Sequence, residues 1–188
     1  MNIFKKFKLW TNGIQQYFFK GNITIGKKVK FYQKLRLYGS GNIIIGDKSS
    51  FGWQTGGRYH NGAVELFAFD KGVIYIGKDV HTNNNFVCSA RSKIIIEDNV
   101  LIGEHVNISD TNGHNVDPRK RRLGSGTARE ITIERNVWIG SNVTILPGTC
   151  IGKNSIVGAG SVVQGIFPSD VIIKGNPAIV CKKIDVKN

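Results

Sequence analysis

One histidine in this chain has acidic neighbours at a spacing that suits proton transfer. His114 lies in the stretch S-D-T-N-G-H-N-V-D-P, residues 109–118, between Asp110 and Asp117. A neutral imidazole can take the proton of an attacking hydroxyl group, and a carboxylate can hold the ring in the required orientation. We therefore predict that His114 is a general base and that Asp110 or Asp117 orients it.

A six-residue repeat indicates the elements that must position this histidine. Its large aliphatic anchors are Ile133, Ile139, Ile145, Ile151, Val157 and Val163, and the small or β-branched residues four places later are Val137, Val143, Thr149, Ser155 and Ser161. A period of six fits neither a helix nor an alternating strand. It predicts a solenoid of very short strands joined by tight bends, in which each thin coil must stack on its neighbours.

The repeat is also present earlier in the chain, with one clear interruption. Residues Ile96, Ile102 and Ile108 keep the six-residue spacing, and the pairs Ile25-Gly26, Ile45-Gly46 and Ile76-Gly77 look like isolated repeat starts. Ile108 and Ile133 are 25 residues apart, one more than four repeats, so the phase is lost between them. We predict a loop extruded from the solenoid at about 109–130, and long loops in compact folds are often functional.

The chain is expected to form one domain with a short N-terminal addition. Residues 1–20 place apolar residues at roughly helical spacing among lysines, which predicts an amphipathic arm or short helix. This arm either caps the first coil or rests on an anionic membrane surface. Residues 21–188 then form the solenoid domain and its closing segment.

Charge and cysteine content restrict the partners and the compartment. The net charge of +13 favours an anionic partner, such as coenzyme A phosphates, an anionic glycan or membrane phosphate. No nucleic-acid-binding motif is present, so we expect no nucleic acid partner. Three cysteines without C-x-x-C spacing argue against a disulfide scaffold or a thiolate zinc site. A cytoplasmic protein, in contact with the inner face of the membrane if the arm binds there, is the expectation.

Two segments resemble a known family. The text IERNVWIGSNVTILPGTCIGKNSIVGAGSVV, residues 133–163, and the tail IIKGNPAIVCKKI, residues 172–184, resemble the hexapeptide-repeat acyltransferases. The S-D-x-x-x-H form around His114 resembles the branch that O-acetylates sialic acid polymers and other capsular sugars. The resemblance implies an all-β, left-handed parallel β-helix, although parallel connections are normally right-handed.

The same resemblance implies an activity and its partners. The expected reaction is direct transfer of an acetyl group from acetyl-CoA to a sugar hydroxyl of a surface or capsular polysaccharide or its precursor. No cofactor is bound permanently, no metal is required, and the active sites of a homotrimer lie between subunits.

The resemblance also assigns site residues. Trp138 is placed near the reacting groups, and the turn from Trp138 to Ser141 is a candidate to hold the oxyanion through a backbone N–H. Acetyl-CoA contacts are expected from Gly140, Ser141, Ala159, Ser161, Lys174, Pro177, Lys182 and Lys183. Independently of the resemblance, we expect acceptor contacts from Asn112, Arg119 and Arg121, whose basic segment would hold either an anionic acceptor or a coenzyme A phosphate. Weaker candidates for acceptor contacts from a neighbouring subunit lie in the early coils at Trp53, Arg58, Tyr59, His81 and residues 83–85.

Other functions remain open at this point. An N-acetyltransferase acting on an amino sugar would use the same base, and a non-catalytic β-solenoid scaffold would need none of these residues. A γ-class carbonic anhydrase needs two zinc-binding histidines five apart, and the histidines here offer no such pair. The sequence leaves open the acceptor sugar, the hydroxyl modified and the length of the acyl chain.

Overall fold

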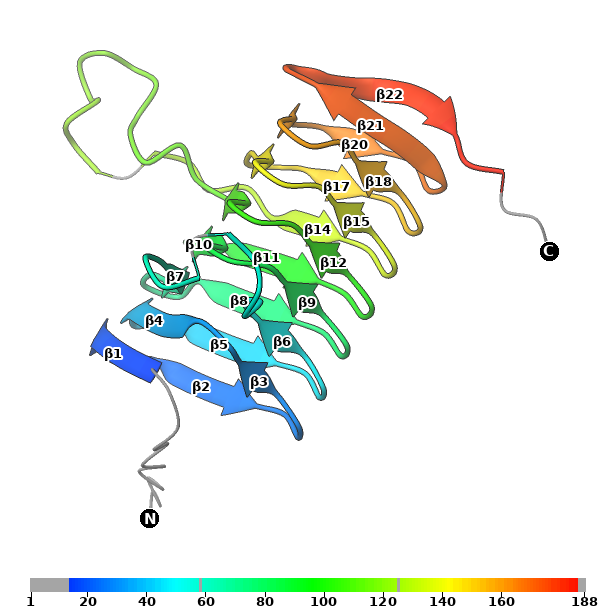
Figure 1. Ribbon diagram of the computed structural model, residues 1–188. Helices are drawn as coiled ribbons and strands as arrows, with labels where there is room; N and C mark the ends of the chain where they lie inside the picture. Colours follow the sequence, from blue (N-terminus) through cyan, green and yellow to red (C-terminus); the bar gives the residue numbers. More distant parts are fainter. Residues whose placement is uncertain (1–13, 58, 125, 186–188) are drawn as a thin grey trace.

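The computed structural model describes residues 14–57, 59–124 and 126–185, and all regular structure in them is β (Figure 1). The chain winds as a parallel β-helix with three sheets. Sheet A contains β1(Ile14–Phe19), β4(Lys34–Gly39), β7(Ala63–Ala68), β10(Val87–Ala90), β13(Asn107–Ser109), β16(Thr144–Ile145) and β19(Val162–Val163). Sheet B contains β2(Asn22–Ile25), β5(Asn42–Ile45), β8(Val73–Ile76), β11(Lys93–Ile96), β14(Ile131–Ile133), β17(Cys150–Ile151) and β20(Ile166–Phe167). Sheet C contains β3(Lys30–Phe31), β6(Ser50–Phe51), β9(His81–Thr82), β12(Leu101–Ile102), β15(Trp138–Ile139), β18(Ile156–Val157), β21(Val171–Gly175) and β22(Ala178–Lys183).

The core is a stack of aliphatic side chains from successive coils. The anchors of the six-residue repeat are buried, and each pairs in register with its equivalent one coil away, as Ile96, Ile133 and Ile151 do in sheet B. The small positions are buried too, so the interior is dry and closely packed. The isolated starts at Ile25, Ile45 and Ile76 fall in this same column, as the repeat predicts.

The corners of the β-helix need a left-handed backbone. Three residues after the end of a sheet B strand, the chain turns through a residue with φ near +60°, for example Asn99 at 60° and Asn136 at 59°. Asn and Asp tolerate this conformation better than most L-residues. Glycine is needed at Gly140, where an added Cβ would lie 2.7 Å from the backbone nitrogen of Ala159 in the next coil.

The N-terminal boundary differs from the expected one. Ile14–Phe19 is the first strand of sheet A and pairs with β4, so these residues belong to the β-helix and are not helical. Strand pairing with the coil above outweighs the helical spacing of apolar residues. The rest of the expected arm, residues 1–13, lies outside the described residues, and with it the expected membrane contact. Among the described residues, no helix has the length and apolarity that crossing a membrane requires.

Two segments leave the coils at corners. The predicted loop is present as residues 110–130, between β13 of sheet A and β14 of sheet B, and it projects from the body in Figure 1. A second excursion, residues 52–62, joins β6 of sheet C to β7 of sheet A and was not predicted from the repeat. At the C-terminal end, β22 folds back antiparallel on β21 and closes the last coil.

Candidate active site

His114 lies exposed on the extruded loop, and its ring is held by the backbone. Its Nδ1 is 3.1 Å from the carbonyl oxygen of Arg121. A carbonyl only accepts hydrogen bonds, so Nδ1 carries a hydrogen, and in the neutral imidazole Nε2 then presents the lone pair. This is the tautomer that a general base needs at Nε2. This partner could not be predicted from the sequence, because every residue has a backbone carbonyl.

The two carboxylates expected to orient His114 are engaged elsewhere. Asp110 is buried, and its carboxylate accepts the backbone N–H groups of Arg91 at 2.9 Å and Ser92 at 2.7 Å. Its carbonyl also accepts the N–H of Arg129, which fastens the two ends of the loop. Asp110 therefore anchors the loop to the preceding coil.

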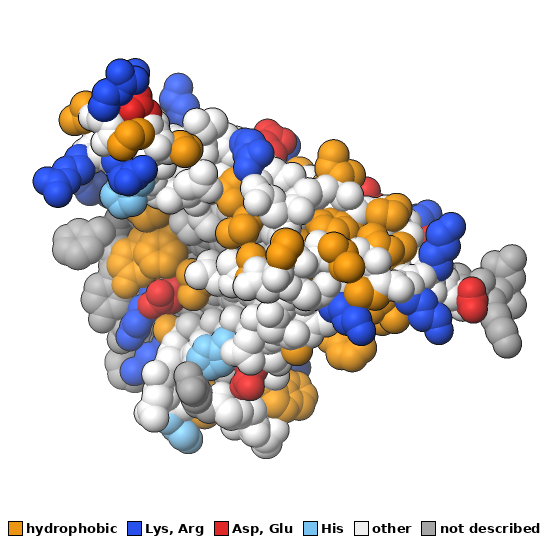
Figure 2. All heavy atoms as spheres, turned by 90° about the horizontal axis from the view of Figure 1, so that it is seen from above, with side chains coloured by type: hydrophobic (Ala, Val, Ile, Leu, Met, Phe, Trp, Pro, Cys, Tyr) orange, Lys and Arg blue, Asp and Glu red, His pale blue; other side chains and the backbone are white. Residues whose placement is uncertain are grey.

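Asp117 forms a local turn with Arg119. Its carboxylate accepts the backbone N–H of Arg119 at 2.9 Å and the guanidinium at 3.1 and 3.0 Å. These hydrogen bonds from Arg119 lower the pKa of Asp117. The expected acceptor contacts Asn112, Arg119 and Arg121 are all exposed on this loop, whose basic side chains stand out in Figure 2.

Trp138 lies on a different part of the molecule from His114. It is 53% exposed on the outer face of sheet C, in register with Leu101 of β12 and Ile156 of β18. His114 leaves from the corner between sheets A and B. A single chain therefore does not bring these two predicted site residues together.

Two backbone N–H groups of the turn from Trp138 to Ser141 are already engaged in hydrogen bonds. The N–H of Trp138 donates to Ser155 at 2.9 Å, and that of Gly140 donates to Val157 at 2.8 Å. Both are coil-to-coil hydrogen bonds that hold the β-helix together. These two N–H groups are therefore not available to an oxyanion, and the expectation for the rest of the turn stays a prediction.

Of the residues expected to bind acetyl-CoA, Ser161 has a buried side chain, whereas those on the turns and on the C-terminal hairpin are partly or fully exposed. Ser161 is fully buried, where its hydroxyl donates to Gly158 at 2.6 Å and accepts from Gly175 at 3.2 Å, so its side chain is structural. Ser141 is partly exposed and Ala159 is exposed at the turn one coil further on. Lys174, Pro177, Lys182 and Lys183 are all exposed on the hairpin of β21 and β22.

Two of the three cysteines are poorly suited to act as nucleophiles, and the third, Cys181, is exposed on β22. Cys88 is fully buried, and burial, with a smaller contribution from Asp110, raises the pKa of its thiol. Burial and the nearby Glu134 and Glu97 also raise the pKa of Cys150. A thiol with a raised pKa is a poor nucleophile because the thiolate is the reactive form. Within the described residues, no three His, Cys, Asp or Glu side chains converge as a metal site would require.

A groove runs along the outer face of sheet C beside Trp138. Trp53, His81, Asn83, Leu101 and Trp138 line its middle section. Three of these residues, Trp53, His81 and Asn83, are among the weaker candidates that we expected to contact the acceptor. Of the other weak candidates, Asn84 is buried and holds the 52–62 excursion through hydrogen bonds with Trp53 and Gly57, and Arg58 lies outside the described residues.

Comparison with known proteins gives a consistent picture. Residues 130–165 match the family model described as bacterial transferase hexapeptide (six repeats). The galactoside O-acetyltransferase of Escherichia coli (strain K12) is 42% identical over 112 residues, which are 60% of this chain and 55% of that protein. This chain spans just over half the length of the curated relatives that it matches, with 58%, 54% and 55% of three of them covered.

Two solved structures extend the comparison to the fold. A galactoside acetyltransferase in complex with coenzyme A is 32% identical, with a TM-score of 0.53 over 89% of this chain and 65% of that chain. The polySia specific acetyltransferase NeuO is 19% identical and shares the fold, with a TM-score of 0.68 over 94% of this chain and 89% of that chain. The fold is thus the left-handed parallel β-helix of hexapeptide-repeat acetyltransferases. Residues 130–165 carry the hexapeptide repeat of bacterial transferases, and the chain as a whole is similar to acetyltransferases built on this fold.

Proposed function

We propose that this protein transfers an acetyl group from acetyl-CoA to a sugar hydroxyl of a surface or capsular polysaccharide or its precursor. The observation that carries the proposal is the exposed imidazole of His114, fixed by the Arg121 carbonyl on a loop extruded from a hexapeptide β-helix. The named relatives act on sugars, as galactoside O-acetyltransferase does. The free cysteines are in keeping with a cytoplasmic setting.

The chemistry is a direct transfer between two bound substrates. Nε2 of His114 takes the proton of the sugar hydroxyl while the hydroxyl oxygen attacks the thioester carbonyl carbon. The tetrahedral intermediate collapses with cleavage of the carbon–sulfur bond, and the coenzyme A thiolate takes the proton from the imidazolium. General base catalysis of this kind typically contributes about 10²–10⁴-fold. The raised pKa values of Cys88 and Cys150 disfavour a route through an acetylated cysteine.

The donor fits along the C-terminal part of sheet C. Leu101, Trp138, Ile156 and Ile172 occupy one outward column in register and form an apolar strip for the pantetheine arm. This strip leads to the β21–β22 hairpin, where the exposed lysines 174, 182 and 183 can meet the coenzyme A phosphates. A lysine binds phosphate as a point charge and tolerates positional slack.

The complete site needs a second copy of the chain. The loop with His114 and the sheet C groove with Trp138 leave the β-helix from different sides, so His114 of one subunit must meet the groove of another. A homotrimer with three such sites satisfies this requirement and also covers exposed apolar side chains such as Ile166, at 84% exposure.

The test is thiol release from acetyl-CoA in the presence of a glycan panel. The wild type is expected to release thiol with at least one sugar acceptor, and His114→Ala is expected to lower that rate about 10²–10⁴-fold. Val116→Ala is the matched control, because Val116 is on the same loop and 78% exposed. Release that persists in His114→Ala would remove the base from the mechanism. Product mass and lability to mild alkali distinguish an O-acetyl ester from an N-acetyl amide.

A further inference from the structure

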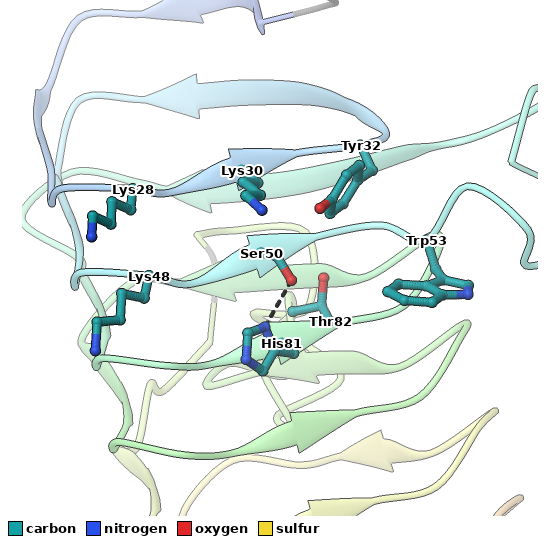
Figure 3. A pocket seen from close by; sticks show the side chains of 8 residues that line it. All are labelled: Lys28, Lys30, Tyr32, Lys48, Ser50, Trp53, His81 and Thr82. Atoms are coloured by element: carbon teal, nitrogen blue, oxygen red, sulfur yellow. Dashed lines mark hydrogen bonds between the residues drawn. The ribbon is translucent and has the colours of Figure 1, made fainter.

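The N-terminal end of the sheet C groove has a basic and aromatic wall. A cavity of about 440 Å³ is lined by Lys28, Lys30, Tyr32, Lys48, Ser50, Trp53, His81 and Thr82. Figure 3 shows these side chains on the strands and turns of the first coils, with Lys28 and Lys48 at one end and Trp53 at the other. His81 Nδ1 lies 2.8 Å from the hydroxyl of Ser50, which holds the ring against the sheet.

Two of the three lysines occupy backbone positions that disfavour lysine. Lys28 and Lys48 have φ of 59° and 61° at equivalent corners of successive coils. Every other non-glycine residue with positive φ in the described part of the chain is Asn, Asp or His. The left-handed conformation is costly for an L-residue without a short polar side chain. The later corners show that Asn or Asp would fit, so the lysines are placed there against local preference.

Lys28, Lys30 and Lys48 form none of the ion pairs seen among the described residues, although Asp79 occupies the equivalent corner one coil beyond Lys48. The ion pairs of the described residues are Arg36–Glu65, Arg91–Asp70 and Arg119–Asp117, and all of them use arginine. Lys28 and Lys48 stack one coil apart, a separation of about 4.8 Å between strands. Like charges at this spacing repel one another. An anion bound in the groove would offset both the repulsion and the backbone cost.

The basic end is continuous with the section beside Trp138. Trp53, His81 and Thr82 line both sections. Lys30, Ser50, His81, Leu101 and Trp138 form one outward column in register. Four strand spacings of about 4.8 Å separate Lys30 from Trp138 by about 19 Å. A carbohydrate chain could therefore present a hydroxyl near Trp138 and extend toward the lysines.

We propose that this lysine groove binds an anionic group, a carboxylate or a phosphate, of the carbohydrate acceptor. Tyr32 and Trp53 offer flat faces for sugar rings, and Lys28, Lys30 and Lys48 bind the negative charge. Only the role of the bound sugar as the acetyl acceptor rests on the proposed function. Binding of an anionic sugar in the groove does not require that transfer follows.

Direct binding tests the groove without relying on catalysis. Titration calorimetry would compare tetragalacturonate, its methyl ester and galactose 1-phosphate, each with wild-type protein at low salt. The acid and its ester share one backbone and differ in charge, and the phosphate tests the other anion source. Tighter binding of either anionic probe than of the ester is expected. Equal binding of acid and ester together with no binding of the phosphate, or binding of none of the three, would overturn the proposal.

The matched variants separate this site from the general charge of the protein. The variant Lys28→Asn/Lys30→Gln/Lys48→Asn is expected to weaken binding of the anionic probe about tenfold, from three modest surface charge contacts. Its Tm is expected to be equal or higher, because Asn suits the two corners. Lys34→Gln/Lys71→Gln/Lys93→Gln removes the same charge elsewhere and is expected to leave binding within about twofold, as distant exposed charges are screened. Equal losses in both variants would overturn the groove assignment.

A parallel measurement of thiol release separates the two proposals. Acetyl transfer to neutral sugars with no lysine dependence would contradict the assignment of the groove to the acceptor and would leave the proposed enzyme activity standing. Lysine-dependent binding of the anionic probe with no transfer to any glycan would contradict the enzyme and leave the groove intact. Tighter binding of a single-stranded oligonucleotide than of either anionic sugar would also overturn the assignment.

Discussion

The corners at the two ends of the β-helix share one left-handed backbone conformation, but they carry different types of side chain. Near the C-terminus, Asn136 donates to Asn154 at 3.0 Å, and Asn154 donates to Asp170 at 2.7 Å, so the corner side chains bond from coil to coil. Near the N-terminus, the corner side chains are the charged Lys28 and Lys48. The corner side chains near the C-terminus therefore stabilise the stack of coils. Those near the N-terminus lower its stability and add positive charge to the surface. This contrast separates the part of the solenoid that maintains the fold from the part that we assign to the acceptor.

The largest expected effect on stability concerns the core beneath these corners. Ile139→Ala, in a coil with neighbours on both sides, is expected to lower the free energy of unfolding by about 2–5 kcal/mol. Ile25→Ala, in the first coil and only partly buried, is expected to cost clearly less, because the lost side chain leaves a smaller enclosed cavity. Chemical denaturation of both variants measures the difference, and equal losses would contradict an unequal distribution of stability.

The two carboxylates of the loop provide the second comparison. Asp110→Asn places an amide where two backbone N–H groups need an acceptor, and it is expected to cost about 1–3 kcal/mol in unfolding free energy. Asp117→Asn alters an exposed turn and should leave the Tm nearly unchanged. Differential scanning calorimetry distinguishes the two, and a Tm loss confined to Asp117→Asn would reverse our assignment of the loop anchor.

The pH dependence of the Asp117 turn follows from its lowered pKa. A carboxyl whose pKa falls on folding contributes stability above its unfolded pKa, and this contribution is lost as the pH falls through the folded pKa. The contact between Asp117 and Arg119 should thus persist at neutral pH and break only in acid. Chemical shifts of the Arg119 backbone amide, followed below pH 5, would check this, and a midpoint near neutrality would contradict it.

Exchanging the corner residues themselves sharpens the contrast. Asn154→Lys removes two coil-to-coil hydrogen bonds and places lysine at φ of 60°, so a loss of about 1–2 kcal/mol is expected. The reverse exchange at the other end, Lys48→Asn, is expected to gain about 0.5–1 kcal/mol. Thermal melts of the two variants should shift in opposite directions. A destabilised Lys48→Asn would mean that lysine is structural at that corner.

The six-residue repeat was sufficient to predict the β-helix, because its period is set by local geometry. Each anchor must point inward and each small residue must turn a corner, and Ile139 and Ser161 do so as expected. The extruded loop was also predictable, since the break in phase after Ile108 is visible in the sequence. The strand at Ile14–Phe19 was not, because pairing with a neighbouring coil overrides local apolar spacing.

The site was only partly predictable, because hydrogen-bond partners depend on contacts distant in sequence. The position of His114 on a loop followed from the sequence, whereas its partner proved to be the Arg121 carbonyl and the nearby Asp110 anchors another coil. The lysine groove could not be predicted from the sequence, because Lys30, Ser50 and His81 lie in one column only in the folded coils. The 52–62 excursion changes the coil length between Ser50 and His81, so their spacing in sequence does not show this register.

The sequence by itself determined the coil, its inward column and the place where the chain leaves it, because these depend on residues six apart. The tertiary structure decided which coils lie beside one another and hence which side chains share a face. It placed Trp138 and Lys30 on sheet C, with Lys28 and Lys48 at the corners that lead into it, and His114 on a loop from another corner, so that the proposed chemistry requires a second copy of the chain. The physical reason is that coil register is set by stacking and by the lengths of two excursions, and neither is encoded in the local repeat.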